Sequence, residues 1–147
     1  MIMSCGPKYI ETAATIEQEY GAPALKYNVP VRSLLEAGIK VVYETDADDL
    51  DKNGAFYLFE HLVTRKDLRG RMWSAEERID RMTALRMGTR WASEYVLREK
   101  QLGSLEAGKW ADLVVLDRDY ASVPEDEIAQ IKVLQTLVAG KTVFQRP

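Results

Sequence analysis

The sequence contains very few of the residues that most often carry catalysis or bind metals. Among its 147 residues there is one cysteine, Cys5, and one histidine, His61. A single cysteine excludes an internal disulfide and agrees with a reducing compartment. A zinc site built within the chain from several histidine and cysteine ligands is excluded as well. A triad of nucleophile, histidine and acid would have to use His61, which no recognisable motif surrounds.

The charge and hydropathy patterns point to neither a nucleic acid nor a membrane. Twenty basic and 23 acidic side chains leave a net charge of −3, so the chain lacks the excess of positive charge that binding to nucleic acid or to an anionic membrane requires. No apolar run approaches the roughly 20 residues that span a bilayer. Residues 1–7 also lack the charged start and long apolar stretch of a signal peptide. We therefore expect a soluble, cytoplasmic protein that binds neither partner, with a hydrophobic content of 46% that suffices for a packed core.

Hydrophobic periodicity and turn residues predict an α/β chain. Helices are expected over residues 8–20, 30–37, 55–67 and 74–96. The last of these has a predicted capping box of Ser74 and Glu77, with its apolar stripe at positions 79, 82, 85, 89, 92 and 96. Strands are expected over residues 39–43, 113–116, 132–138 and 142–144, the last two joined as a hairpin through Ala139-Gly140. One strand among four helices gives no complete sheet, so these elements indicate part of a larger fold.

Several motifs carry a resemblance to a known family. They are GSLEAGKWADLVVLD at residues 103–117, VTRK at 63–66, PVRSLLEAG at 30–38 and TLVAGK at 136–141. Together they resemble the C-terminal segment of metal-dependent amidohydrolases, in the branch related to N-substituted formamide deformylases. The resemblance spans nearly the whole chain. It implies a (β/α)8 TIM barrel that carries the active site, with a small β-sandwich beside it.

The resemblance implies that the chain is the C-terminal portion of such a protein. A complete barrel takes about 250 residues, more than this sequence contains. Residues 1–100 are expected to hold the last βα units of the barrel, with 39–43 as its last strand. Residues 101–147 are expected to hold the C-terminal part of the composite β-sandwich.

Asp46 is the candidate catalytic and metal-ligating residue. It follows the strand over 39–43 at its carboxyl end, where barrel enzymes place catalytic groups. Thr45-Asp46 matches the Thr-Asp or Ser-Asp of the family at this point, whereas Glu44 departs from its usual pattern. The resemblance implies that Asp46 binds a divalent metal, zinc being the expected ion, and moves a proton from the attacking water to the leaving amine. The implied substrate is a small-molecule amide, hydrolysed at a non-peptide carbon–nitrogen bond.

The histidine ligands of the family have no counterpart here, which leaves a second function open. A metal held by one carboxylate is weakly bound and poorly oriented. The chain is then a fragment or a non-catalytic subunit that associates with itself or with a complementing N-terminal segment. His61 and Cys5 match none of the family's ligands, and we expect a surface or helix-packing histidine and an unreactive thiol.

A third function is a calcium-binding module. Residues 49–60 satisfy the EF-hand spacing, with oxygen ligands at Asp49, Asp51, Asn53 and Glu60 and glycine at position 54. An EF-hand needs an amphipathic helix before this loop, and the preceding residues form a β-rich run. Coincidence within an acidic loop is therefore the favoured interpretation.

Overall fold

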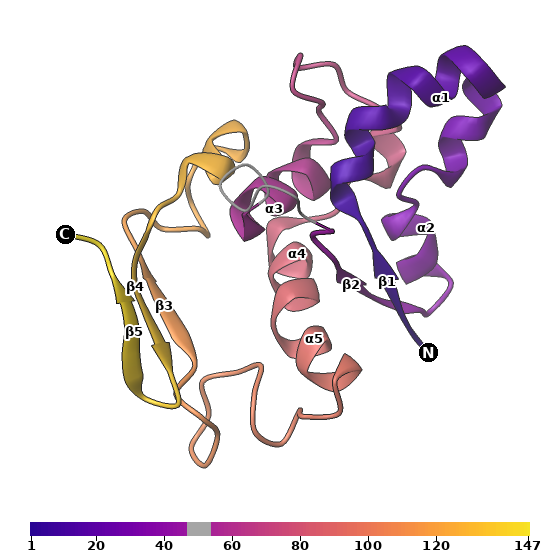
Figure 1. Ribbon diagram of the computed structural model, residues 1–147. Coiled ribbons are helices and arrows are strands. Elements are labelled where there is room, and N and C mark those ends of the chain that lie inside the picture. Colours follow the sequence, from indigo (N-terminus) through magenta and orange to yellow (C-terminus); the bar gives the residue numbers. More distant parts are fainter. Residues whose placement is uncertain (47–53) are drawn as a thin grey trace.

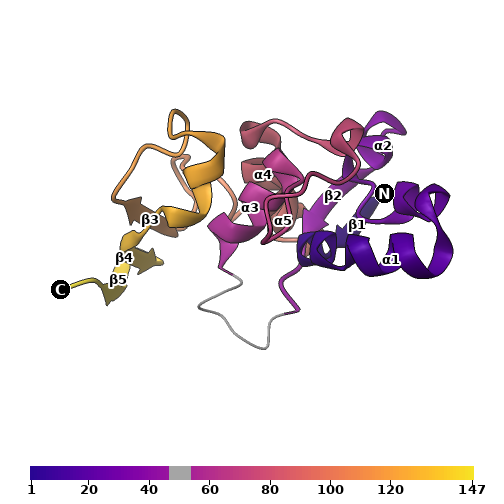
Figure 2. The ribbon, with the colours of Figure 1, turned by 90° about the horizontal axis from the view of Figure 1, so that it is seen from above.

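Two separate sheets organise the chain, and helices lie between and around them (Figures 1 and 2). The computed structural model describes residues 1–46 and 54–147. One sheet pairs β1 (Ile2–Cys5) with β2 (Lys40–Tyr43). The other contains β3 (Leu113–Leu116), β4 (Val133–Val138) and β5 (Lys141–Gln145). This mixture of helices and strands agrees with the predicted α/β class.

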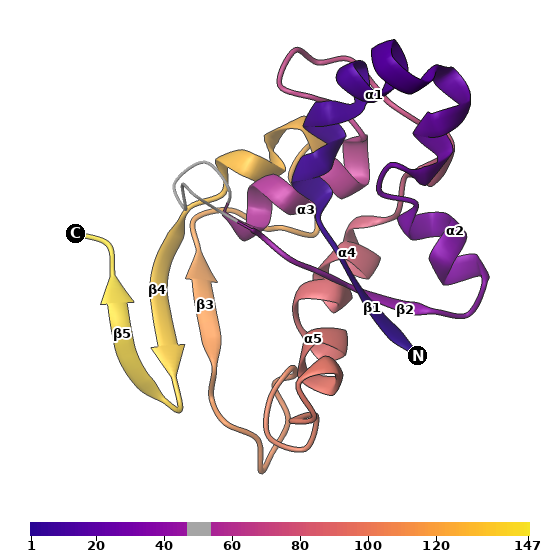
Figure 3. The ribbon, with the colours of Figure 1, turned by 45° about the vertical axis from the view of Figure 1, so that its right-hand side comes forward.

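β1 and β2 run parallel, in a register from Ile2 opposite Lys40 to Cys5 opposite Tyr43 (Figure 3). A parallel pair needs a long crossover connection. It consists here of η1 (Pro7–Thr12), α1 (Ala13–Tyr20), η2 (Ala22–Tyr27) and α2 (Val31–Glu36). Because parallel strands end at the same edge of a sheet, the segments that follow β1 and β2 lie side by side.

β1 was not predicted from the sequence, and one continuous helix was predicted where η1 and α1 stand. The four residues of β1 show no alternation of apolar and polar side chains. They become a strand through the ladder with β2, which a local pattern does not reveal. The first turns after β1 are 3-10 rather than α-helical, and Pro7 stands at their start.

The single helix predicted over residues 74–96 is wrong. Ser74 has a left-handed φ of 49° and makes no capping hydrogen bond, and only η3 (Ala75–Glu77) follows it. The Glu77 carboxylate instead accepts hydrogen bonds from the backbone N–H of Ser33, at 3.0 Å, and from its hydroxyl. The helix begins later, at α4 (Arg81–Gly88), and a break at Thr89 separates it from α5 (Arg90–Tyr95).

Asp80 supplies the true N-cap of α4, because its Oδ1 accepts from the backbone N–H of Thr83 at 2.9 Å. The buried face of this region also differs from the predicted stripe. Ala84 and Met87 are fully buried, whereas Met82 and Val96 of the predicted stripe are 44% and 57% exposed. Within the described part of the chain, no helix has both the length and the apolarity to cross a membrane.

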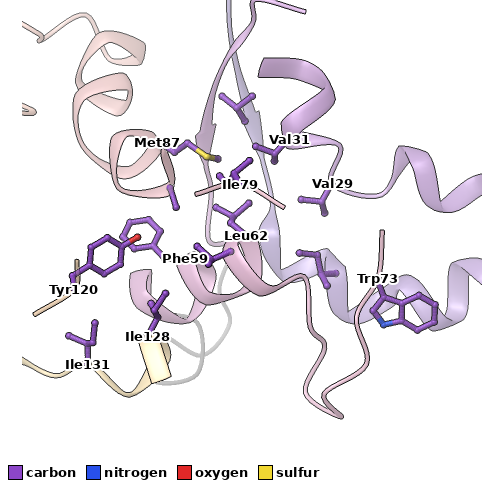
Figure 4. Close-up of a cluster of buried hydrophobic side chains, with 14 of the residues drawn as sticks. Val29, Val31, Phe59, Leu62, Trp73, Ile79, Met87, Tyr120, Ile128 and Ile131 are labelled. Carbon is purple, nitrogen blue, oxygen red and sulfur yellow. The ribbon is translucent and has the colours of Figure 1, made fainter. Parts of the chain in front are cut away.

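A shared core joins the parallel strand pair to the C-terminal region (Figure 4). At its centre lies α3 (Ala55–Thr64), whose Leu62 packs among buried residues of β2, α4 and η4 (Glu125–Gln130). Ile128 of η4 is fully buried, and the rings of Phe59 and Tyr120 lie 5.7 Å apart. The C-terminal region is therefore anchored to the helices through η4.

The C-terminal sheet is an antiparallel meander, with the predicted hairpin at its end confirmed. Ala139 and Gly140 have φ values of 48° and 77°, the two positive values that a type I′ turn requires. Apolar side chains of this sheet are exposed: Val114 by 48%, Val143 by 62% and Phe144 by 45%.

Substitution of Gly88 tests how tightly α4 packs against β2 and α3. A methyl group there would lie 2.5 Å from Cε1 of Tyr43 and 2.8 Å from Cζ of Phe59. At an open helical position, glycine to alanine stabilises by up to about 1 kcal/mol. Here we expect Gly88→Ala to lower the free energy of unfolding by about 1–3 kcal/mol, because overpacking outweighs helix propensity. Urea denaturation measures the change, with Arg86→Ala on the exposed face of α4 as the control; a stabilised Gly88→Ala variant would contradict the packing.

Candidate active site

Asp46 lies just beyond β2, at the edge of the sheet where η1 follows β1. Its backbone has a left-handed φ of 40°, a conformation that aspartate tolerates better than most residues. Its side chain is 59% exposed. The structure therefore places the predicted residue where the sequence analysis expected it, at the carboxyl end of a parallel strand and open to the surface.

Two residues of η1 hold one oxygen of the Asp46 carboxylate. The Tyr9 hydroxyl donates to Oδ2 at 2.6 Å, and Nζ of Lys8 lies 3.0 Å from the same oxygen. Lys8 Nζ also donates to the Asp46 carbonyl oxygen. Among residues 1–46 and 54–147, no hydrogen bond reaches Oδ1 of Asp46.

These contacts fix the charge of Asp46. The hydrogen bond from Tyr9, followed by the hydrogen bond and charge of Lys8, lowers the pKa of Asp46 below its usual value. The carboxylate is therefore ionised at neutral pH. An exposed, ionised carboxylate with one free oxygen is suited to binding a cation or accepting a proton.

A hydrogen-bond chain connects this edge to the interior. The side-chain amide of Asn28 donates to the Tyr9 carbonyl at 3.1 Å. The Asn28 carbonyl in turn accepts from Nη2 of Arg65 at 3.0 Å. Arg65 is completely buried, and its other bonds go to the carbonyls of Val29, at 2.9 Å, and Trp73, at 3.0 Å. Neither Lys8 nor Tyr9 was predicted as a site residue, and Arg65 was recognised only as part of the VTRK motif.

The described residues do not form a complete metal site. No group of three or more histidine, cysteine, aspartate or glutamate side chains that could hold a metal occurs among them. Cys5 lies at the end of β1, but burial raises the pKa of its thiol to about 11, and the nearby charge of Glu44 adds to this. The thiol is therefore protonated at neutral pH and unreactive, as predicted.

His61 is a packed residue of α3, 3% exposed. Its Nε2–H donates to Oε1 of Glu11 at 2.7 Å, and its ring lies 4.2 Å from that of Tyr57. Nδ1 is buried and has no hydrogen-bond partner within the described residues. The structure thus places the one histidine of the chain in a packing contact between α3 and η1, with no hydrogen bond or ion pair to Asp46 among the described residues.

The first five positions of the EF-hand pattern, 49–53, with three of its four predicted ligands, lie outside the described residues, which exclude 47–53. Its last position, Glu60, stands within α3. There Oε2 of Glu60 accepts from the backbone N–H of Ala129 at 2.8 Å, which ties α3 to η4. Glu60 therefore has a structural contact in place of the calcium ligation that the pattern requires.

Comparison with known proteins adds to this geometry. The model of the amidohydrolase family matches residues 3–144. The chain belongs to this family. The resemblance stated from the motifs is therefore confirmed, and the match covers both sheets of the structure.

Characterised relatives are several times longer than this chain. It is 34% identical over 117 residues to the N-substituted formamide deformylase of Arthrobacter pascens, which covers 80% of this chain and 21% of the relative. It is 38% identical over 87 residues to a 5-methylthioadenosine/S-adenosylhomocysteine deaminase of Bacillus cereus, and this match covers 59% of this chain and 19% of the relative. The chain thus spans about a fifth of the length of these relatives.

Solved structures share the fold. A metal-dependent hydrolase of Pyrococcus horikoshii matches with a TM-score of 0.70 and 22% identity, over 83% of this chain and 25% of that one. An amidohydrolase of Thermotoga maritima matches with a TM-score of 0.62 and 15% identity, over 99% of this chain and 37% of that one. The arrangement described above is thus that of a segment of larger amidohydrolase structures.

Arg65 offers a test of the hydrogen-bond chain. Replacing it by methionine keeps the stem but removes the donor from the carbonyl oxygens of Asn28 and Trp73, whereas the Val29 carbonyl still accepts from the backbone N–H of Val31 at 2.9 Å. Each buried polar group left unpaired costs about 1–3 kcal/mol. We expect Arg65→Met to lower the free energy of unfolding by about 3–5 kcal/mol in denaturant titrations. Arg69→Met, at an exposed position, is the control, and equal effects of the two variants would show that the bonds are unimportant.

His61 gives the structure a defined pH dependence. Burial lowers the pKa of His61, and it outweighs the attraction of Glu11. The unfolded chain therefore binds the proton more readily, so the free energy of unfolding falls as the pH drops below the unfolded pKa of about 6.5. His61→Gln keeps an N–H donor for Glu11 and does not titrate.

Urea denaturation of both proteins between about pH 5 and pH 8 measures this effect. Relative to His61→Gln, the wild type is expected to lose stability below about pH 6.5, by at most about 1.4 kcal/mol per pH unit. Above that pH the difference between the two is expected to stay constant. A difference that does not vary across the whole range would contradict the buried, neutral state of His61.

Proposed function

We propose that this chain is the C-terminal portion of a metal-dependent amidohydrolase that hydrolyses a non-peptide carbon–nitrogen bond of a small-molecule amide. Residues 1–100 would supply the last βα units of its barrel, with β1 and β2 as the last two strands. Residues 101–147 would supply part of a β-sandwich, in which the exposed apolar side chains of β3 to β5 find partners. The family membership and the short span against longer relatives support this assignment.

The observation that carries the proposal is the position and state of Asp46. It is ionised, exposed and located at the carboxyl edge of parallel strands, where barrel enzymes place their catalytic groups. Its Oδ2 is held by Tyr9 and Lys8, and its Oδ1 accepts no hydrogen bond from the described residues. A carboxylate in this state fits one ligand of a divalent ion such as zinc.

Asp46 would contribute a single ligand, so the remaining ligands are proposed to lie outside residues 1–46 and 54–147. They would come from preceding sequence or from a complementing chain. A divalent ion held by Asp46 and those ligands would supply an activated water for hydrolysis. The Asp46 carboxylate would take up a proton and deliver it to the leaving nitrogen.

The proposed substrate class is an N-substituted formamide or a related small amide. The deformylase relative matches 80% of this chain, whereas the deaminase relative matches 59%. The two activities release different products, because deformylation yields formate and an amine while deamination of an adenosine yields ammonia. Product analysis of the native-length protein with both substrate classes therefore distinguishes them.

Substitution of Asp46 tests the mechanism. We expect Asp46→Asn, assayed in the native-length protein with N-substituted formamides, to lower kcat by about 100-fold or more, the range that a general acid–base group supplies. Asp126→Asn is the matched control, because Asp126 is another exposed aspartate paired with a lysine, Lys66, through contacts of 2.7 Å. Activity of Asp46→Asn within about threefold of the wild type would overturn the role assigned to Asp46.

A further inference from the structure

The segment that follows β1 holds Asp46 in an asymmetric way. Both side-chain contacts go to Oδ2: the Tyr9 hydroxyl at 2.6 Å and Lys8 Nζ at 3.0 Å. Oδ1 receives no hydrogen bond from the part of the chain that the structure describes. The carboxylate is thus tied through one oxygen while the other stays open. Of the two partners, Tyr9 gives the direction, because its hydroxyl sits on a rigid ring and lysine has a flexible stem.

Tyr9 is itself held in place at several points. Its carbonyl accepts from Nδ2 of Asn28 at 3.1 Å and from Oγ1 of Thr12 at 2.8 Å. Its ring lies against Gly6, where a Cβ atom would approach Cδ2 and Cε2 of Tyr9 to 2.8 Å. The ring can therefore occupy this position only because residue 6 carries no side chain.

We propose that Tyr9 is a positioning residue of the active site, whose hydroxyl holds Oδ2 of Asp46 and thereby orients Oδ1 toward the metal that the proposed function requires. This inference rests on the proposed function of Asp46. Outer hydrogen bonds orient the carboxylates that bind metals, and their loss typically lowers metal affinity or activity 10- to 100-fold. Tyr9 acts here through Asp46 and does not contact the reacting atoms.

The decisive variant is Tyr9→Phe, which removes the hydroxyl and keeps the ring. Tyr57→Phe is the matched control, because it also removes a tyrosine hydroxyl that donates to a carboxylate, Glu11, at 3.2 Å. In the native-length protein, Tyr9→Phe is expected to lower kcat and zinc affinity about tenfold or more, with KM changed less than about twofold. Tyr57→Phe is expected to leave all three within about twofold. Zinc affinity is measured by calorimetric titration, a readout independent of turnover.

Two further measurements separate positioning from a general structural role. Gly6→Ala displaces the Tyr9 ring without altering its hydroxyl, and it is expected to reproduce the loss of kcat and zinc affinity. The carbon-13 shift of the Asp46 carboxyl group in the metal-free protein is expected to move in Tyr9→Phe and to stay unchanged in Tyr57→Phe. A purely structural role would lower the free energy of unfolding and leave zinc affinity and the carboxyl shift unaffected.

Asp46→Asn, measured alongside, distinguishes failure of this inference from failure of the proposed function. If Asp46→Asn loses hydrolysis while Tyr9→Phe keeps kcat and zinc affinity within about twofold of the wild type, the positioning role is overturned and the proposed function stands. If Asp46→Asn retains hydrolysis, the proposed function fails, and the role of Tyr9 fails with it. Loss of activity in both, with the control unaffected, supports the two together.

Discussion

The parallel ladder between β1 and β2 is the constraint on which the candidate site depends. Its register sets Cys5 opposite Tyr43, so the chain leaves both strands at one edge. That geometry brings η1 to Asp46 although a long crossover separates them in the sequence. A shift of the ladder by one residue would reverse the side-chain directions along β1 and move Tyr9 relative to the carboxylate. The approach of η1 to Asp46 is therefore set by a strand register.

Much of the fold depends on residues close together in the sequence, and that part could be predicted. The strand over 39–43, the strand at β3 and the hairpin at Ala139-Gly140 agree with the structure because β-branched runs and turn residues act over a few positions. The failures depend on contacts distant in sequence. β1 is a strand only through its pairing with β2. Glu77 caps no helix because its carboxylate accepts a hydrogen bond from the backbone N–H of Ser33. A capping box is a local signal that a tertiary hydrogen bond can override.

The same division applies to the site. The location of Asp46 could be predicted because its strand and the Thr-Asp pair adjoin it in the sequence, whereas its role stays a proposal. Tyr9 and Lys8 could not, since their approach to Asp46 requires β1, which has no local signal. The role of Arg65 could not be predicted either. Its guanidinium donates to the backbone carbonyls of Asn28, Val29 and Trp73, and the pattern of side chains in a sequence gives no sign of such backbone acceptors. Its own left-handed φ of 57° ends α3 at the point from which those groups can be reached.

The left-handed backbone of Asp46 has a consequence for evolution and engineering. A residue other than glycine in that conformation stores strain of about 1 kcal/mol or more, which aspartate bears better than most. Glycine at position 46 would release that strain and lose the carboxylate. The relief of strain would be offset by loss of the contacts to Tyr9 and Lys8 and by the greater chain entropy of glycine, and the role proposed for Asp46 would be lost with the carboxylate. Libraries built for stability in this family member should accordingly hold position 46 fixed.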